Sequence, residues 1–353
     1  FFSAFRSVMS EPAAKKAKLS CSAALSFPRH SAPTFPRRRM FNGFFAPTPT
    51  PYNDDGSVNL DLIPVLGEKL VADGADGVFI NGTAGEGVLL APADRKAMTE
   101  AWVKFAGPKA TRKLKIISHV GEENGPATKD LAAHAQAAGV DGIACMSPCI
   151  FKPKSVVSLV DWLADIASAC PSTPFIYYHC TFLTGPSFRC FDILRACDLA
   201  IPNMKGCKFT DRDIGDLATC LQYFPDMDIF PAFDNQLLMS CLLGADAFVS
   251  CGVNLIAPMY KACFNLVRAG KLEEAKAVMA RIIDFWERCE TYSSGVYSKI
   301  GHLAKWLVGL KLGGKKFGPP CRPIASMSSD EMKGVDALLR DWGWKDWTVT
   351  PTE

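Results

Sequence analysis

The chain has 353 residues, 48% of them hydrophobic, a length and composition that suit one large or two ordinary globular domains. Its net charge of +3 is uneven, because residues 1–40 hold eight Lys/Arg and one acid and leave the remainder at about −4. A main body with this balance argues against a nucleic-acid-binding surface.

Residues 1–40 are rich in Ser, Ala, Pro and Arg. This composition is typical of a disordered extension and also resembles a transit peptide, while residues 12–18 resemble a short basic nuclear signal. We expect a disordered or targeting extension at 1–40, followed by a single domain at 41–345 that includes a C-terminal helical extension. We expect the protein in the cytoplasm unless the extension directs it elsewhere.

The fourteen cysteines are scattered and form no Cys-x-x-Cys motif. A disulfide framework is typical of much shorter secreted chains, so a reducing intracellular compartment fits better. The five histidines are also dispersed, and we therefore predict no metal site and no cofactor. The weakly charged stretch 237–260 contains Asp246, two glycines and Pro258, which argues against a membrane span.

From about residue 43, short apolar runs alternate with longer amphipathic ones, as in parallel strands joined by helices. The predicted strands are 44–48, 77–81, 114–119, 142–146, 174–178, 204–208, 227–232 and 247–250. The predicted helices are 60–73, 92–106, 127–138, 155–169 and 235–243, then about 257–269, 271–290, 295–311 and 328–341. Eight such units predict an α/β fold, a (β/α)8 TIM barrel with additional C-terminal helices; a doubly wound sheet is the alternative.

Two predicted strands end at reactive side chains, Tyr178 on the fifth and Lys208 on the sixth. Both would lie at the C-terminal face of the barrel, together with the loop 82–87 that follows the second strand. Alternation along a strand puts Gly206 and Lys208 on one side and Lys205 on the other. We expect Lys208 to point inward with room left beneath it by Gly206, and Lys205 to meet the helices or solvent.

These residues together suggest imine-forming aldol chemistry. Apolar surroundings favour the neutral amine of a lysine, which is the form that attacks a carbonyl carbon, and a nearby tyrosine can move protons. Backbone N–H groups of the loop and the Thr83 hydroxyl would hold a carboxylate. His179 is predicted to be a structural hydrogen-bonding residue. A strand-end lysine that reaches water and a core tyrosine remain the alternatives for Lys208 and Tyr178.

Four segments resemble the pyruvate-dependent class I aldolases, the family that includes N-acetylneuraminate lyase and dihydrodipicolinate synthase. They are the loop Asn-Gly-Thr-Ala-Gly-Glu-Gly at 81–87, Tyr-Tyr-His-Cys-Thr-Phe-Leu-Thr-Gly at 177–185, Gly-Cys-Lys-Phe-Thr-Asp at 206–211 and Phe-Gly-Pro-Pro-Cys-Arg-Pro at 317–323. The resemblance runs from about Phe41 to Trp344 and is closest to the animal-type sialic acid lyases. Where the synthases carry an arginine and a strand-four tyrosine, this chain has Leu183 and residues 149–151, Cys-Ile-Phe.

The resemblance implies that Lys208 forms the imine, that Tyr178 relays a proton, and that Thr83 with the backbone of Ala84 binds the pyruvate carboxylate. It also places five residues against the hydroxylated chain of a sugar acid, namely Thr210, Ala232, Asp234, Asn235 and Cys251. Several positions depart from the lyase pattern, because Ala84 replaces a Thr, Thr181 a Pro, Ala232 a Gly, Asn235 a Glu and Cys251 a Ser. Fewer hydroxyls and charges should weaken recognition of a polyol.

The activity that the resemblance implies is cleavage of N-acetylneuraminate into N-acetylmannosamine and pyruvate. The reaction would need no cofactor beyond the covalent imine, and its partners would be the keto-acid sugar and pyruvate, with no nucleic acid and no membrane. A homotetramer is also implied. One alternative is an aldolase for another 2-keto-3-deoxy acid, and the other is a non-catalytic barrel that binds a keto acid or a protein.

Overall fold

The computed structural model describes residues 38–185, 188–291 and 300–343. Eight parallel strands pair in the order β7-β6-β5-β4-β3-β2-β1-β8, and β7 also lies against β8, which brings the two ends of the sheet together as a barrel. The strands are β1 (Gly43–Pro47), β2 (Gly77–Ile80), β3 (Lys115–His119), β4 (Gly142–Met146), β5 (Phe175–His179), β6 (Met204–Phe209), β7 (Asp228–Pro231) and β8 (Ala247–Val249).

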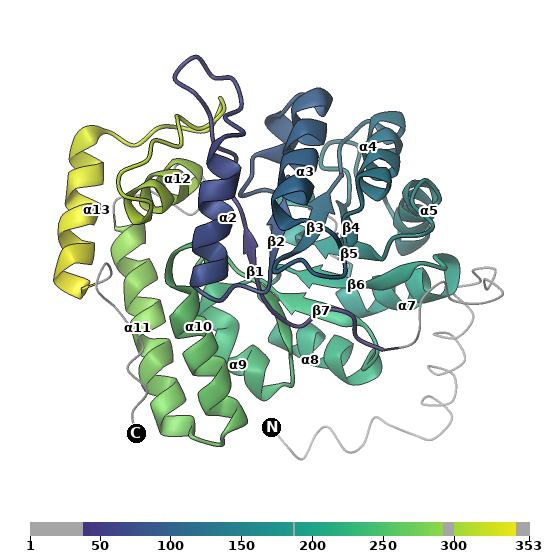
Figure 1. Cartoon of the computed structure of the whole chain (residues 1–353). Helices are drawn as coiled ribbons and strands as arrows, with labels where there is room; N and C mark the ends of the chain where they lie inside the picture. The colour runs from purple at the N-terminus through teal and green to yellow at the C-terminus, as the bar shows by residue number, and fades with distance from the viewer. Residues whose placement is uncertain (1–37, 186–187, 292–299, 344–353) are drawn as a thin grey trace.

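Helices surround the strands, and a further group packs on one side of the barrel (Figure 1). Those of the barrel are α2 (Leu62–Ala72), α3 (Pro92–Ala106), α4 (Gly125–Ala138), α5 (Val156–Ala167), α7 (Cys190–Ala200), α8 (Ile214–Tyr223), α9 (Leu237–Leu242) and α10 (Val253–Arg268). Short turns lie at η1 (Gly87–Leu89), α6 (Thr181–Thr184) and η2 (Asp234–Gln236), and the C-terminal group is α11 (Leu272–Glu290), α12 (Ile300–Lys311) and α13 (Ser329–Trp342). The predicted (β/α)8 barrel with additional C-terminal helices is confirmed.

All eight predicted strands are present, each end within one residue of its predicted position. The predicted helices did not include α7 and α8, which occupy the two positions between β5 and β7. Helix α10 begins at Val253 instead of 257, because a first helical turn precedes a kink at Ile256 (φ −135°, ψ 36°) and Pro258. The proposed extension lies outside the described residues except for 38–40, as do residues 295–299 of one predicted helix and the boundary at 345.

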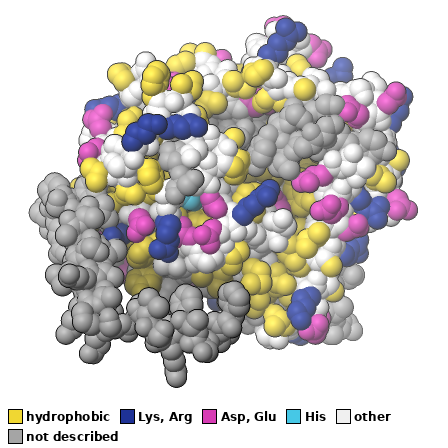
Figure 2. All heavy atoms as spheres, turned by 180° about the vertical axis from the view of Figure 1, so that it is seen from behind, with side chains coloured by type: hydrophobic (Ala, Val, Ile, Leu, Met, Phe, Trp, Pro, Cys, Tyr) yellow, Lys and Arg dark blue, Asp and Glu magenta, His cyan; other side chains and the backbone are white. Residues whose placement is uncertain are grey.

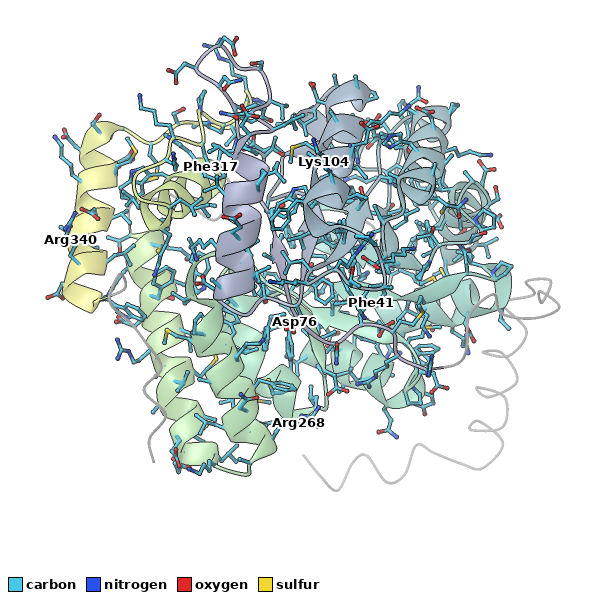
Figure 3. All side chains as sticks on the ribbon, in the orientation of Figure 1. Phe41, Asp76, Lys104, Arg268, Phe317 and Arg340 are labelled. Carbon is cyan, nitrogen blue, oxygen red and sulfur yellow. The ribbon has the colours of Figure 1, made fainter. Side chains whose placement is uncertain are left out.

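Side chains alternate between the barrel interior and the helices along each strand. In β5, Ile176 and Tyr178 point inward, whereas Phe175 and Tyr177 pack against the helices. Phe41, shown with Asp76 in Figure 3, lies at the N-terminal end of the barrel, where its ring contacts those of Phe45 and Phe230 at centroid distances of 5.9 and 5.7 Å. Aromatic rings of the described residues therefore fill this end of the barrel.

Of the two lysines of β6, Lys205 does not lie as predicted. The pairing of β5 with β6 shifts register so that Phe175 faces Met204 and Ile176 faces Gly206, and Lys205 falls between them. Lys205 is only 4% exposed, and its ammonium donates hydrogen bonds to the carbonyl oxygens of Arg38 and Asp226. The expectation that it meets helices or solvent was wrong, since it bonds the backbone at the closed end of the barrel.

Gly206 serves strand pairing. A Cβ at this position would lie 1.9 Å from the carbonyl oxygen of Asp228 on β7. The expectation that Gly206 leaves room beneath Lys208 was therefore wrong, because the neighbouring backbone occupies the space that a side chain would need.

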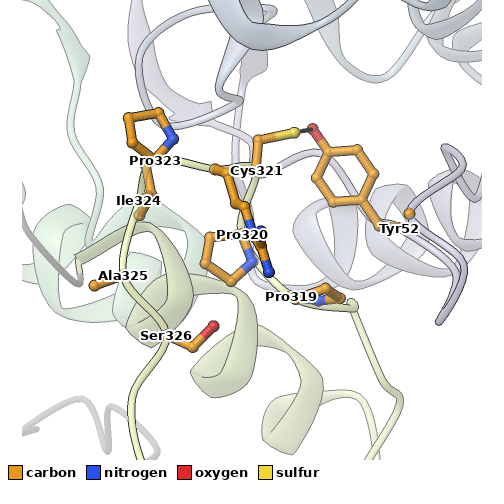
Figure 4. A pocket seen from close by; sticks show the side chains of 10 residues that line it. Tyr52, Pro319, Pro320, Cys321, Pro323, Ile324, Ala325 and Ser326 are labelled. Atoms are coloured by element: carbon orange, nitrogen blue, oxygen red, sulfur yellow. Dashed lines mark hydrogen bonds between the residues drawn. The ribbon is translucent and has the colours of Figure 1, made fainter.

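A buried ion pair connects the loop after β2 to the C-terminal helices. Glu86 has a left-handed backbone (φ 57°), and its carboxylate lies 2.7 Å from the ammonium of Lys305 on α12. The backbone N–H of Cys321 donates to the same carboxylate, and the Lys305 ammonium lies 4.0 Å from the ring centroid of Tyr52. Figure 4 shows the adjoining groove, where the Cys321 thiol lies 3.0 Å from the Tyr52 hydroxyl. Both charged side chains are almost fully buried, so each needs the opposite charge of the other to offset its loss of hydration.

We predict that Lys305→Met destabilises the protein by about 3–5 kcal/mol, because it leaves the Glu86 carboxylate buried without its cation. Urea unfolding measures the loss. Adding Glu86→Gln to Lys305→Met should recover part of the stability, since no uncompensated charge then remains.

The control is Lys129→Met, which removes the solvent-exposed Lys129–Asp165 pair and should cost at most about 1 kcal/mol. Equal losses in the two lysine variants would contradict a structural role for the buried pair.

Candidate active site

Lys208 lies inside the barrel near the C-terminal end of β6, directly opposite Tyr178 in the register of β5 and β6. Its ammonium is 4.0 Å from the ring centroid of Tyr178 and 4.3 Å from that of Phe79. Burial lowers the pKa of Lys208 from 10.5 to about 8, although the nearby Cys251, Cys180 and Asp234 act in the opposite direction. The expected inward orientation of Lys208 is observed.

This environment changes how much of the lysine can react. With a pKa of about 8, roughly a tenth of the amine is neutral at pH 7, against roughly one part in three thousand for an ordinary lysine. The neutral amine attacks carbonyl carbons, and the aromatic faces still stabilise the cation that returns in each cycle. The residue is thus suited to form and release an imine near neutral pH.

Tyr178 connects Lys208 to the loop after β2. Its hydroxyl is 3.2 Å from the Thr83 hydroxyl, and its ring packs edge-on against Phe79 and His119. Burial raises the pKa of Tyr178 well above 10, so the phenol stays protonated and can both donate and accept a hydrogen bond. The structure brings Thr83, Tyr178 and Lys208 together, as the sequence predicts.

The loop has the geometry of an anion site. Asn81 is held in a left-handed conformation (φ 58°), with its side-chain amide bonded to the Arg95 carbonyl. The N–H groups of Glu86 and Gly87 are used within the loop, whereas those of Thr83 and Ala84 have no partner in the described part of the chain. Two free N–H groups beside a hydroxyl can hold a carboxylate.

The residues predicted to contact a sugar chain follow β6, β7 and β8 at the C-terminal end of the barrel, across from the loop after β2. The Asp234 carboxylate is fixed by two hydrogen bonds, because its Oδ1 accepts from the Gly252 N–H at 2.9 Å and from the Tyr260 hydroxyl. Burial raises the pKa of Asp234 to about 6, which the two hydrogen bonds partly oppose. Cys251, in the loop after β8, is a neutral thiol, since burial raises its pKa to about 12.

The remaining predicted residues differ in exposure. Thr210 is buried, and its hydroxyl has no hydrogen-bond partner among the described residues. Ala232 is half-buried and its N–H donates to the Phe209 carbonyl, while Asn235 is exposed in η2. Only Thr210 therefore presents an unsatisfied hydroxyl, and Asn235 lies at the rim.

His179 points away from the reactive group. Its ring packs against Phe209, one ring nitrogen lies 3.4 Å from the Tyr177 hydroxyl and the other 3.7 Å from Asp211. Burial lowers the pKa of His179 to about 4, so it is neutral at physiological pH. These contacts agree with the structural role expected for this residue.

Two residues of the site were not predicted. His119 lies inside the barrel against the Tyr178 ring. It faces inward because it lies two residues after Ile117, which also faces the interior of the barrel. Tyr260, which bonds Asp234, comes from α10. Nothing near Tyr260 in the sequence indicates this contact, because the two residues are 26 positions apart.

The described residues 38–185, 188–291 and 300–343 contain no group of three His, Cys, Asp or Glu side chains suited to hold a metal ion. Within the same ranges, every helix is too short or too polar to cross a membrane. On the face shown in Figure 2, the described basic and acidic side chains are interspersed among hydrophobic ones.

A barrel with a buried lysine near the C-terminal end of a strand, a tyrosine beside it and a loop with free N–H groups is typical of the imine-forming barrel aldolases. Residues 40–341 match the Dihydrodipicolinate synthetase family, and the chain belongs to that family. The resemblance carried by the four sequence segments is confirmed.

The similar proteins include sialic acid lyases. The chain is 34% identical to N-acetylneuraminate lyase B of Xenopus laevis over 248 residues, which are 70% of this chain and 92% of that protein. It is 30% identical to N-acetylneuraminate lyase of Rattus norvegicus over 309 residues, 87% of this chain and 93% of that protein. The solved structure of Proteus mirabilis N-acetylneuraminate lyase superposes with a TM-score of 0.79 at 28% identity, over 86% of this chain and 99% of that one.

We predict that Tyr178→Phe lowers the rate of carbon–carbon cleavage by about a hundredfold or more, because it removes the hydroxyl and keeps the ring that packs on Phe79. Steady-state pyruvate release measures the rate, and the melting temperature should change little.

Tyr177→Phe is the matched control, since Tyr177 is equally buried but its hydroxyl faces His179 on the outer side of β5. Full activity in Tyr178→Phe, or the same loss in both variants, would contradict a role in proton transfer.

Proposed function

We propose that the protein is a class I aldolase of the N-acetylneuraminate lyase type, which cleaves N-acetylneuraminate into N-acetylmannosamine and pyruvate. The observation that carries the proposal is the buried Lys208, with its lowered pKa, facing Tyr178 and Thr83 at the open end of the barrel. The similarity to lyases over most of their length supports the choice of substrate.

The reaction begins when the neutral amine of Lys208 attacks the C2 ketone of the open-chain sugar acid. Loss of water gives a protonated imine, which accepts the electron pair of the C3–C4 bond. Removal of the C4 hydroxyl proton breaks that bond, releases N-acetylmannosamine and leaves an enamine on Lys208. Protonation of the enamine at C3 and addition of water then release pyruvate and restore the amine.

Tyr178 is the group that moves protons in these steps. The Lys208 ammonium lies 4.0 Å from the centroid of its ring, and its hydroxyl is hydrogen-bonded to Thr83, so a proton can pass between the reacting atoms and the loop. The Thr83 hydroxyl and the free N–H groups of Thr83 and Ala84 bind the substrate carboxylate, which fixes C2 near the amine.

The sugar side supports a second candidate, an aldolase for another 2-keto-3-deoxy acid. Asp234 is the one carboxylate among Thr210, Ala232, Asp234, Asn235 and Cys251, and Cys251 is a poor hydrogen-bonding partner. Such a site favours a substrate with fewer hydroxyls. A panel of keto-acid sugars of different length, read by pyruvate release, separates the two candidates.

Further properties follow from this assignment as part of the proposal. The aldolase domain spans residues 41–345, residues 1–40 are an extension, the active form is a homotetramer, and the protein works in the cytoplasm. The covalent imine takes the place of a cofactor. A non-catalytic barrel is the remaining alternative, and imine trapping tests it directly.

We expect borohydride reduction with pyruvate to add a pyruvate-derived mass to the peptide that contains Lys208. The initial rate should rise with pH and level off above about pH 8, because the neutral amine is then the major form. Mass spectrometry of the digested protein identifies the site.

Lys208→Arg should abolish the label. Lys205 is the internal control, since its ammonium bonds backbone carbonyls at the closed end. Labelling at Lys205, or no label in an enzyme that releases pyruvate, would overturn the assignment.

We predict that Asn235→Glu raises kcat/KM for N-acetylneuraminate by roughly ten- to a hundredfold, because a carboxylate accepts charge-assisted hydrogen bonds from hydroxyls. Pyruvate trapping should stay unchanged, since Asn235 is at the rim.

Asn235→Gln provides side-chain length without charge and should give little gain. If Asn235→Glu abolishes cleavage, or if a shorter keto acid is the better substrate of the unmodified enzyme, the second candidate replaces the first.

A further inference from the structure

Asp234 is hydrogen-bonded by residues of two helices that take no part in the proposed reaction. Tyr260 of α10 is fully buried, its hydroxyl bonds Asp234 Oδ1, and the indole N–H of Trp286 on α11 lies 3.3 Å from the same hydroxyl. Two helices outside the catalytic strands thus support one carboxylate oxygen, α10 directly and α11 through the Tyr260 hydroxyl.

The direction of these hydrogen bonds is fixed by chemistry. An indole N–H can only donate, so the Tyr260 oxygen accepts from Trp286 and its single proton must go to Asp234. The Gly252 N–H donates to the same oxygen, Oδ1. Asp234 Oδ1 therefore has two donors.

The surrounding packing leaves Tyr260 little freedom. Its ring packs edge-on against Phe44 at a centroid distance of 6.1 Å. A Cβ at position 252 would lie 2.1 Å from the Tyr260 hydroxyl oxygen, so this close approach requires glycine. The kink at Ile256 lies about one helical turn before Tyr260.

We propose that Tyr260 is a positioning residue for recognition of the substrate's hydroxylated chain, because it occupies Oδ1 of Asp234 and leaves Oδ2 to accept hydrogen bonds from substrate hydroxyls. This inference rests on the proposed function, in which Asp234 contacts the sugar. It gives the C-terminal helices a part in substrate selection.

The orientation of Asp234 matters more here than in a site with several acceptors, since Cys251 and the exposed Asn235 contribute little. The groups that interact with the Asp234 carboxylate by charge or hydrogen bonding are Lys208 from β6, the Cys251 loop after β8 and Tyr260 from α10. Burial raises the pKa of Asp234 to about 6, and the hydrogen bond from Tyr260 opposes the rise. The carboxylate accepts the stronger, charge-assisted hydrogen bonds only when it is deprotonated, so binding of a polyol weakens as the pH falls below about 6.

The test is Tyr260→Phe, which keeps the ring and removes the hydroxyl. We expect kcat/KM for N-acetylneuraminate to fall about ten- to a hundredfold, mainly through KM, as for the loss of a hydrogen bond to a charged group. The pH at which KM rises should move upward, because the carboxylate loses a donor. Cleavage of a short 4-hydroxy-2-oxo acid and borohydride trapping with pyruvate should change by no more than about twofold, since neither uses the sugar side.

Trp286→Phe is the second variant and should give a smaller loss in the same direction, while Tyr177→Phe is the control for removing a buried hydroxyl. Equal losses on long and short substrates would mean a merely structural role and overturn the inference, as would unchanged KM and pH dependence in Tyr260→Phe. If Tyr260→Phe does not fold, the Trp286→Phe comparison of long and short substrates decides.

Failure of the proposed substrate has a different signature. An unmodified enzyme that is labelled by pyruvate but does not cleave N-acetylneuraminate refutes that substrate alone. The role of Tyr260 is then measured with the best polyhydroxylated keto acid of the panel, by the same ratio of long to short substrates.

Discussion

The site depends on removing one amine from water. Lys208 is 5% exposed and lies between the rings of Phe79 and Tyr178, so its ammonium form loses hydration and regains only part of it from aromatic faces and a distant carboxylate. The barrel makes this feasible, because its closed end is packed with aromatic rings and its strands are buried on both sides. The fold thus supplies surroundings that disfavour the charged form of Lys208, as attack of the amine on a carbonyl requires, and the rest of the site surrounds this residue.

Lys205 shows how much the environment decides. It is three residues from Lys208 on the same strand and is also buried, yet its ammonium bonds two backbone carbonyls at the closed end. Such an amine has its protons engaged and has no access to a ligand. The residue type does not determine reactivity; the end of the strand and the partners of the nitrogen do.

Much of the fold could be predicted because each strand carries its own apolar run with turn residues at both ends. The inward orientation of Lys208 and Tyr178 follows from alternation alone. Gly206 could not be interpreted correctly, because the close approach of the Asp228 carbonyl on β7 depends on the pairing of β6 with β7, which no local pattern indicates. Tyr260 and Asp234 are 26 residues apart, and the pairing of Glu86 with Lys305 depends on how α12 docks; both contacts depend on tertiary packing.

The Glu86–Lys305 pair has a consequence for how the molecule opens. Glu86 holds an uncommon left-handed backbone within the loop after β2, and a loop of this kind relaxes when its support is removed. Its support is a lysine on α12, so local unfolding of α12 and loss of the loop geometry belong to one cooperative unit. Helix α12 is therefore not an appendage to a self-sufficient barrel, because exposing it would also remove the cation that holds the loop after β2.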